Sequence, residues 1–240
     1  MVGATGALGA IICRQLVASG AVVVASGRSL DKLKALQSDL SAESVDIAQV
    51  DVRLDSAINV VIQGIVAAHG RIDALVNTTS VSRFADFLEL DDEAWQEILD
   101  SKLMAYVRTC RAAIPYMIKQ GQGDIVNISG RSARQPLPTH LPGGCANAAV
   151  NLLSKGLADR FYDDNIRVNV VAPGPIESER FSAIESSHHQ NAAASARPAL
   201  TRKIGEPSDI AEAVLWLLSS RSRQLTGVIL PVDGGSTVCV

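Results

Sequence analysis

The stretch Gly3-Ala4-Thr5-Gly6-Ala7-Leu8-Gly9 decides the fold, because it places three glycines directly before the apolar run 10–17. Glycines at a turn between a strand and a helix let the backbone approach a pyrophosphate, and the amino end of the helix then faces the negative charge. The spacing differs from the standard G-x-G-x-x-G, so the turn by itself carries little weight. A predicted strand at residues 21–25, ending in Ser26-Gly27-Arg28, supplies the context that a dinucleotide-binding turn requires.

Beyond this turn, short β-branched runs alternate with longer segments of helical periodicity. This pattern is typical of βαβ units, so we expect an α/β fold with a doubly wound parallel sheet, forming a single domain over residues 1–240. The predicted strands are 21–25, 47–50, 74–77, 124–129, 167–171 and 228–232. The predicted helices are about 8–18, 29–40, 54–69, 92–119, 144–162 and 208–219, and Pro115 is expected to kink the long one or end it early.

The chain begins at Met1-Val2, which leaves no room for the strand that feeds a glycine turn. That strand is the central one of such a sheet, and its loss would leave buried backbone groups unpaired. We therefore expect the first strand to be missing. Either the natural gene product begins further upstream, or this copy is truncated and impaired.

Charge and composition exclude several classes of protein. The chain has 22 Lys+Arg against 25 Asp+Glu, a net charge of −3, which argues against a basic nucleic-acid-binding surface. It contains neither the roughly 18 apolar residues of a membrane span nor a leader peptide, so a cytoplasmic protein is expected. The cysteines and histidines lack metal-ligand or redox spacing, so we expect reduced thiols, mostly in the core, and no metal. They are Cys13, Cys110, Cys145, Cys239, His69, His140, His188 and His189.

Arg28 predicts which nicotinamide dinucleotide the turn would bind. An acidic residue at the end of the second strand of the fold accepts a hydrogen bond from the ribose 2′-hydroxyl of NAD, whereas an arginine accommodates the 2′-phosphate of NADP. Here the acid is missing and Arg28 is present, which favours NADP(H) over NAD(H). The alternative is that Arg28 is a solvated loop charge.

Over essentially its full length, the chain resembles the short-chain dehydrogenase/reductase family. The opening glycines are similar to the family's G-x-x-x-G-x-G, with Ala7 at the middle glycine, and Asp51-Val52 resembles its adenine-contacting pair. The stretches 75–80, 172–176 and 232–235 resemble its Asn-Asn-Ala-Gly, Pro-Gly and C-terminal motifs. The resemblance implies a Rossmann fold, oxidoreductase activity and a homodimer or homotetramer. It also implies cofactor contacts at Gly3, Thr5, Gly6, Leu8, Gly9, Arg28, Asp51, Val52, Asn77, Pro173, Gly174 and Ile176.

The family's Asn-Ser-Tyr-Lys tetrad is not kept. No tyrosine is followed four residues later by lysine, since Tyr106, Tyr116 and Tyr162 precede Cys110, Gln120 and Ile166 at that spacing. Alignment with the family places Gly143 at the tyrosine position, Asn147 at the lysine position and Gly130 at the serine position, directly after Ser129. Lys102, aligned through Trp95 and Leu103, takes the place of the asparagine, so asparagine and lysine have exchanged positions.

This exchange suggests a non-standard proton-transfer set. Lys102 would donate a proton or stabilise a developing alkoxide from the neighbouring helix, and His140 would supply a proton near neutral pH. Ser129 would donate a hydrogen bond to a substrate carbonyl, and Asn147 completes the set of candidate catalytic residues. The alternatives are a solvated Lys102 and a structural or exposed His140.

Three functions stay open at this point. The first is an NADP(H)-dependent oxidoreductase acting on a carbonyl or alcohol, the second a catalytically silent dinucleotide-binding protein, and the third a non-redox enzyme such as a lyase or dehalogenase. The surviving cofactor motifs favour the first, whereas the absent tyrosine favours the second.

The Ser/Ala-rich tract 182–196 predicts either a lid or a plain loop. Arg83, Arg131 and Arg134 would suit an acidic or carboxylate-bearing substrate, the alternative being that at least two of them are solvated surface residues. Leu152, Leu153 and Leu157 fit an oligomer interface or a core face equally well.

Overall fold

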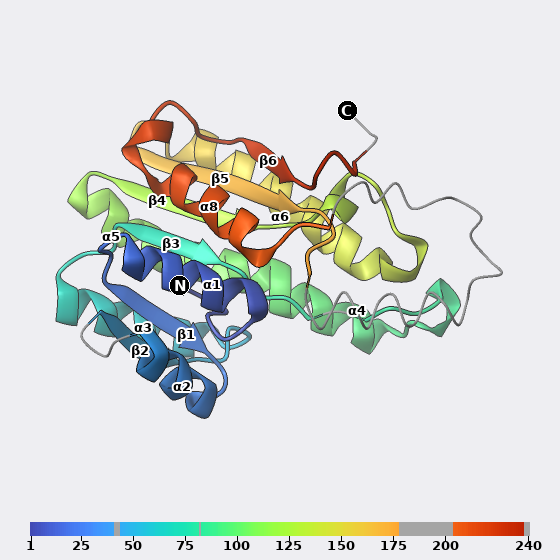
Figure 1. Cartoon of the computed structure of the whole chain (residues 1–240), viewed down its shortest axis with the longest axis horizontal. Helices are drawn as coiled ribbons and strands as arrows, with labels where there is room; N and C mark the ends of the chain where they lie inside the picture. Colours follow the sequence, from blue (N-terminus) through green and yellow to red (C-terminus); the bar gives the residue numbers. More distant parts are fainter. Residues whose placement is uncertain (41–43, 82, 178–203, 238–240) are drawn as a thin grey trace.

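A parallel β-sheet with helices on both faces forms the molecule (Figure 1). The structure, a computed structural model, describes residues 1–40, 44–81, 83–177 and 204–237. Its strands are β1 Val23–Gly27, β2 Val45–Gln49, β3 Ala74–Asn77, β4 Gly123–Ile128, β5 Ile166–Pro173 and β6 Ile229–Val232. Its main helices are α1 Ala7–Ala18, α2 Leu30–Leu40, α3 Asp55–His69, α4 Asp92–Leu99, α5 Ala105–Gln120, α6 Leu141–Arg160 and α8 Pro207–Leu218. The predicted α/β class and doubly wound sheet are confirmed, with element boundaries displaced by a few residues.

The sheet consists of two parts that Met1 and Val2 join. One part pairs β1 with β2, and the other runs β3-β4-β5-β6. The Val2 amide donates to the Val76 carbonyl at 2.8 Å, and the Ser26 amide donates to the Met1 carbonyl at 2.8 Å. Val2 thus bridges Ser26 on one side and Asn77 on the other. These two residues occupy the central position of the sheet, where the sequence predicts that a strand is missing.

A hollow of about 480 Å³ lies beside Met1 and Val2. It is lined by Met1, by the β1 residues Val23 and Val24, and by the β3 residues Ala74 and Leu75, among others. The amino group of Met1 lies beside it and donates to the Val24 carbonyl at 2.9 Å. Burial lowers the pKa of this amino group below its ordinary value, because its charged form is poorly hydrated there.

The two faces of the sheet carry different helices. α1 and α8 cover one face, where Ile12 and Val214 pack against the strand residues Val76 and Val171. α3, α5 and α6 cover the other, where Ile62, Tyr106 and Val150 join a second apolar cluster. Because every strand runs parallel, the carboxyl ends of the strands meet at one edge, and the loops that follow them form the candidate site. None of the helices in the described part of the chain has the length and apolar character needed to cross a membrane.

The predicted helix 92–119 is interrupted, but not where its proline stands. α4 ends at Leu99, a π-helical turn spans Asp100–Met104, and α5 then continues past Pro115 to Gln120. The expected early end at Pro115 is wrong. Arg111 and Pro115 both lie on the exposed face of α5, so the Arg111 carbonyl, which has lost its helical donor, remains accessible to water. The π turn is the feature that matters for the site, because π turns often mark functional positions and this one contains Lys102.

Candidate active site

The glycine turn fits a pyrophosphate. Gly3 adopts a φ of +80°, and a Cβ there would lie 2.6 Å from Thr78 Oγ1. A Cβ at Gly9 would lie 2.1 Å from the Gly3 carbonyl oxygen, so α1 can approach the turn only because residue 9 is glycine. Gly6 is the N-cap residue of α1 and provides no side-chain hydrogen bond to the helix. The first turn of α1 lies wholly within the described residues and contains no acidic side chain. The amino end of α1 therefore presents an uncompensated positive dipole to an anion.

A cluster of charges lies where β1 and β2 end. Arg28 is exposed, and its backbone carbonyl accepts a hydrogen bond from Gln49 Nε2 at 2.9 Å. Asp51 accepts from Arg53 Nε at 3.0 Å and from Arg53 Nη2 at 2.6 Å. The hydrogen bonds from Arg53, with a smaller contribution from Arg28, hold the pKa of Asp51 below its ordinary value. Sequence reasoning missed Arg53, although a position two residues after Asp51 lets the guanidinium form this two-point ion pair with the carboxylate.

Asn77 and Val52, two of the predicted cofactor contacts, are both buried. The Asn77 side chain is fully buried, donates to Asn127 Oδ1 at 2.9 Å and accepts from Thr109 Oγ1 at 2.9 Å. Asn127 in turn donates to Ser154 Oγ on α6 at 2.9 Å. This network ties β3, β4, α5 and α6 together beneath the candidate site. Sequence reasoning named Asn77 but missed its partners Thr109, Asn127 and Ser154, although Asn77 and Asn127 are direct partners in the parallel register.

Lys102 is buried, with 5% of its surface exposed. Its Nζ donates to the Ile128 carbonyl at 2.7 Å, and it lies 5.4 Å from the centre of the Tyr106 ring. The Tyr106 hydroxyl donates to the same carbonyl at 3.0 Å. The π turn thus brings an ammonium group to the carboxyl end of β4, as the alignment predicts, and the alternative of a solvated lysine is excluded.

His140 is also buried, with 6% of its surface exposed. Its Nδ1 lies 3.3 Å from the Arg83 carbonyl oxygen, and its ring stacks on Phe84 with centroids 4.5 Å apart. A carbonyl oxygen can only accept, so Nδ1 carries the hydrogen in this contact. A Cβ at Gly143 would lie 2.0 Å from His140 Nε2. The imidazole therefore fills the space that a side chain at position 143 would enter, which excludes the reading of His140 as an exposed loop residue.

Asn147 fills a second vacated space. A Cβ at Gly130 would lie 2.9 Å from Asn147 Nδ2, so the amide lies where a side chain at position 130 would begin. Asn147 Nδ2 donates to Ser132 Oγ at 3.0 Å. Asn147 Oδ1 and the hydroxyl of Ser129 are buried and have no hydrogen-bond partner among the residues that the structure describes. Buried polar atoms left without partners are costly unless they serve a ligand or water.

The opposite wall of the site begins at the end of β5. Pro173 ends that strand, and a Cβ at Gly174 would lie 2.6 Å from Asp233 Cα, so only glycine allows the close approach of the two segments. Ile176 bridges Gly205. The tract 182–196, with His188 and His189, lies outside the described residues, so its two predicted readings stay predictions.

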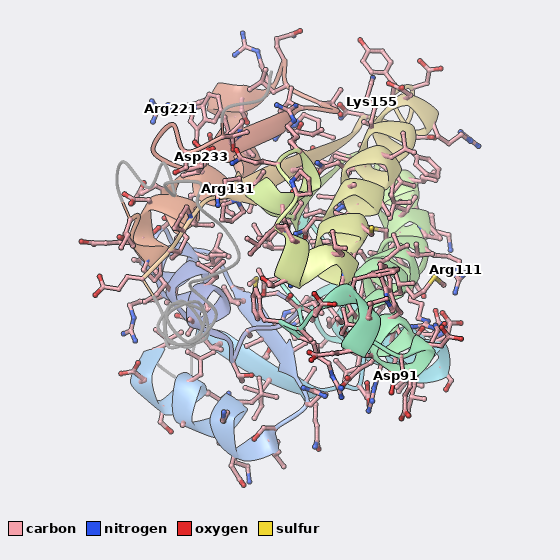
Figure 2. All side chains as sticks on the ribbon, turned by 90° about the vertical axis from the view of Figure 1, so that its right-hand side faces the viewer. Asp91, Arg111, Arg131, Lys155, Arg221 and Asp233 are labelled. Carbon is pink, nitrogen blue, oxygen red and sulfur yellow. The ribbon has the colours of Figure 1, made fainter. Side chains whose placement is uncertain are left out.

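Two of the three arginines proposed for an acidic substrate already have protein partners. Arg83 Nε lies 3.5 Å from Glu97 Oε2. Arg131 donates to the Ser236 carbonyl at 3.4 Å, and Figure 2 shows it beside Asp233. Burial opposes ionisation of Asp233, but hydrogen bonds from Thr237 and Gly235, with a smaller contribution from the charge of Arg131, hold its pKa below the ordinary value. Arg134 is exposed.

Comparison with known proteins agrees with this geometry. Residues 3–237 match the family model described as enoyl-(acyl carrier protein) reductase. The chain is 30% identical over 238 residues to 3-oxoacyl-[acyl-carrier-protein] reductase of Thermotoga maritima, covering 98% of this chain and 96% of that one. It is 31% identical over 237 residues to acetoacetyl-CoA reductase of Acinetobacter sp., covering 97% and 94%.

Solved structures agree as well. The L-sorbose reductase of Gluconobacter frateurii, solved with NADPH and L-sorbose, superposes with a TM-score of 0.90 at 26% identity, covering 100% of this chain and 96% of that one. Full-length matches of sequence and fold, together with the glycine turn, identify the chain as a member of the short-chain dehydrogenase/reductase family and as an oxidoreductase of carbonyl or alcohol substrates.

Proposed function

We propose that this protein is an NADP(H)-dependent oxidoreductase in which His140 takes the proton-transfer role of the missing tyrosine. The observation that carries the proposal is the position of the imidazole, whose Nε2 lies 2.0 Å from where a Cβ at Gly143 would be. A histidine is suited to the role because its pKa lies near neutrality in water. The contact from Nδ1 to the Arg83 carbonyl supports the choice of the second ring nitrogen, Nε2, as the atom that would exchange the proton.

The cofactor end of the proposal rests on the glycine turn and on Arg28. Gly3, Thr5, Gly6, Leu8 and Gly9 would hold the pyrophosphate at the amino end of α1. Arg28 would bind the 2′-phosphate, and Asp51 with Val52 would border the adenine. Asn77 would contribute to cofactor binding by holding the loop that follows β3 in place, because its side chain is already hydrogen-bonded to Asn127 and Thr109. Pro173, Gly174 and Ile176 would border the nicotinamide.

The chain's own groups divide the remaining chemistry among them. When bound, NADPH supplies a hydride to the carbonyl carbon. His140 gives a proton from Nε2 to the carbonyl oxygen, leaving a neutral imidazole and an alcohol. Lys102 contributes positive charge where negative charge develops on that oxygen, and the Ser129 hydroxyl contributes a hydrogen-bonding group. Asn147 serves the site through the hydroxyl of Ser132, to which its amide donates. The reverse reaction runs through the same atoms, with neutral His140 as the base.

Two of the relatives suggest the first substrates to test. The reductases of Thermotoga maritima and Acinetobacter are named for 3-oxoacyl and acetoacetyl thioesters. Acetoacetyl-CoA is therefore the first probe, and free acetoacetate tests whether the thioester is needed.

A homodimer or homotetramer completes the proposal. Leu152 on α6 has 77% of its surface exposed, whereas Leu153 and Leu157 pack against the core. An exposed leucine in the middle of a long helix supports an interface there, and Leu152→Glu is the variant that tests it by light scattering.

A catalytically silent dinucleotide-binding protein is the second candidate. The Lys102 contact to the Ile128 carbonyl favours it, because an ammonium group held by a backbone carbonyl is also what a structural lysine would show. The two candidates differ in one measurement, NADPH oxidation with acetoacetyl-CoA by wild type and His140→Phe. The proposal expects turnover by wild type and loss of at least about 100-fold in the variant, since general acid catalysis contributes that much. NADPH binding without any oxidation would support the silent protein.

A further inference from the structure

The Ser132 hydroxyl accepts one hydrogen bond, and its own hydrogen remains able to donate another. Its oxygen accepts from Asn147 Nδ2 at 3.0 Å. The hydroxyl hydrogen finds no acceptor among the residues that the structure describes. A hydroxyl that accepts from an amide is polarised and becomes a better donor through its own hydrogen.

Ser132 also lies at the right edge of the sheet. It belongs to the short helical turn Arg131–Ala133, which directly follows the end of β4. A Cβ at Gly144 would lie 3.2 Å from the Ser132 carbonyl oxygen and 3.7 Å from Ser132 Cβ. Gly144 follows Gly143, whose open side His140 fills, so Ser132 and His140 flank the same first turn of α6.

Asn147 is the residue that orients this hydroxyl. Its amide nitrogen reaches both the space beside Gly130 and the Ser132 oxygen. Asn147 has 7% of its surface exposed, and its Oδ1 is buried without a partner among the described residues. The only side-chain hydrogen bond that the structure gives Asn147 among the described residues is therefore the one to Ser132, which fixes the direction of that hydroxyl.

We propose that Ser132, oriented by Asn147, donates a hydrogen bond to the substrate oxygen that receives the proton from His140. The inference rests on the proposed function and adds a catalytic residue to it, with Asn147 as its positioning residue. Ser129 is the more buried of the two serines, whereas Ser132 retains partial exposure for contact with a substrate. The substrate group that fits is a ketone or aldehyde oxygen, which can accept hydrogen bonds from both Ser132 and His140 as negative charge develops on it.

The test compares four variants with wild type by their steady-state kinetics with NADPH and acetoacetyl-CoA. Ser132→Ala is expected to lower kcat by about 100-fold, the range for loss of one oxyanion donor, and to leave NADPH affinity unchanged. Asn147→Asp is expected to lower kcat similarly, because a carboxylate accepts the hydroxyl hydrogen and turns it away from the substrate. The double variant is expected to be no slower than either single one, since both remove the same bond. Ser38→Ala, at an exposed position on α2, is the matched control.

Three outcomes overturn the inference or a part of it, and they are distinguishable. If wild type turns over and His140→Phe does not, but Ser132→Ala keeps kcat within about twofold, Ser132 is not the donor and the proposed function survives. If wild type binds NADPH and oxidises none of it, the proposed function fails and the inference fails with it. Additive losses in the double variant would show that Asn147 does not act through Ser132. Rescue of kcat by Ser132→Thr, which restores a hydroxyl, separates loss of the donor from loss of folding.

Discussion

His140 and Gly143 depend on each other, because one side chain fills the space that the other leaves open. A Cβ at position 143 would lie 2.0 Å from the imidazole. Gly143→Ala should therefore destabilise the protein by about 1–3 kcal/mol, the usual cost of overpacking. In a His140→Ala background the imidazole is gone, so Gly143→Ala should raise the free energy of unfolding, since alanine is a better helix former than glycine by roughly 1 kcal/mol. Denaturant unfolding of the four proteins measures this, and the same sign in both backgrounds would contradict the geometry.

The thiols offer a second residue-scale prediction. Burial raises the pKa of Cys13 to about 11 and that of Cys110 to about 12. A raised pKa means less thiolate, so at pH 8 both buried thiols are almost entirely in the unreactive protonated form. Cys145 is exposed.

In a Cys239→Ser background, we expect one thiol to react rapidly with a chromogenic disulfide at pH 8 and two to react only on unfolding. Rapid labelling of all three in the folded protein would show that Cys13 and Cys110 are not enclosed as described. A matched Cys145→Ser variant should remove the rapid phase alone.

At the scale of elements, sequence reasoning placed the strands and helices to within a few residues, because β-branched runs and helical periodicity report local burial. It could not place the π turn at Asp100–Met104, since no residue type specifies such a turn. Nor could it foresee that the His140 ring would stack on Phe84 and fill the space beside Gly143, because that depends on how the loop after β4 folds back on α6. The alignment did identify Lys102, His140 and Asn147 as candidates, but not their partners.

The hollow between β1 and β3 gives the element-scale prediction. A five-residue apolar strand added before Met1 should pair with both neighbours and fill about 480 Å³ of space. It would also replace the buried Met1 ammonium by a neutral amide. We expect Tm to rise by at least about 5 °C, since 1 kcal/mol corresponds to roughly 2–4 °C for a chain of this size. A Gly/Ser extension of equal length is the control, and equal Tm values for the two extensions would exclude strand pairing there.

At the scale of the whole molecule, the fold brings together two ends of the proposed cofactor site that are distant in sequence. The glycine turn and Arg28 lie in the first half of the chain, whereas Pro173 ends β5 and Gly174 directly follows it. Arg28→Ala should weaken NADPH binding about 10-fold or more and leave NADH binding nearly unchanged, because only the former carries a 2′-phosphate. Fluorescence titration with both cofactors measures this. Equal weakening of both would show that Arg28 does not select between them.

The most direct test of the central claim is NADPH oxidation with acetoacetyl-CoA by wild type and His140→Phe, each with its NADPH affinity measured in parallel. Phenylalanine keeps the ring that stacks on Phe84 but has no proton to give. The account predicts equal NADPH affinities and a loss of at least about 100-fold in kcat for the variant. Full turnover by His140→Phe with unchanged NADPH affinity would contradict the assignment of His140 as the proton donor.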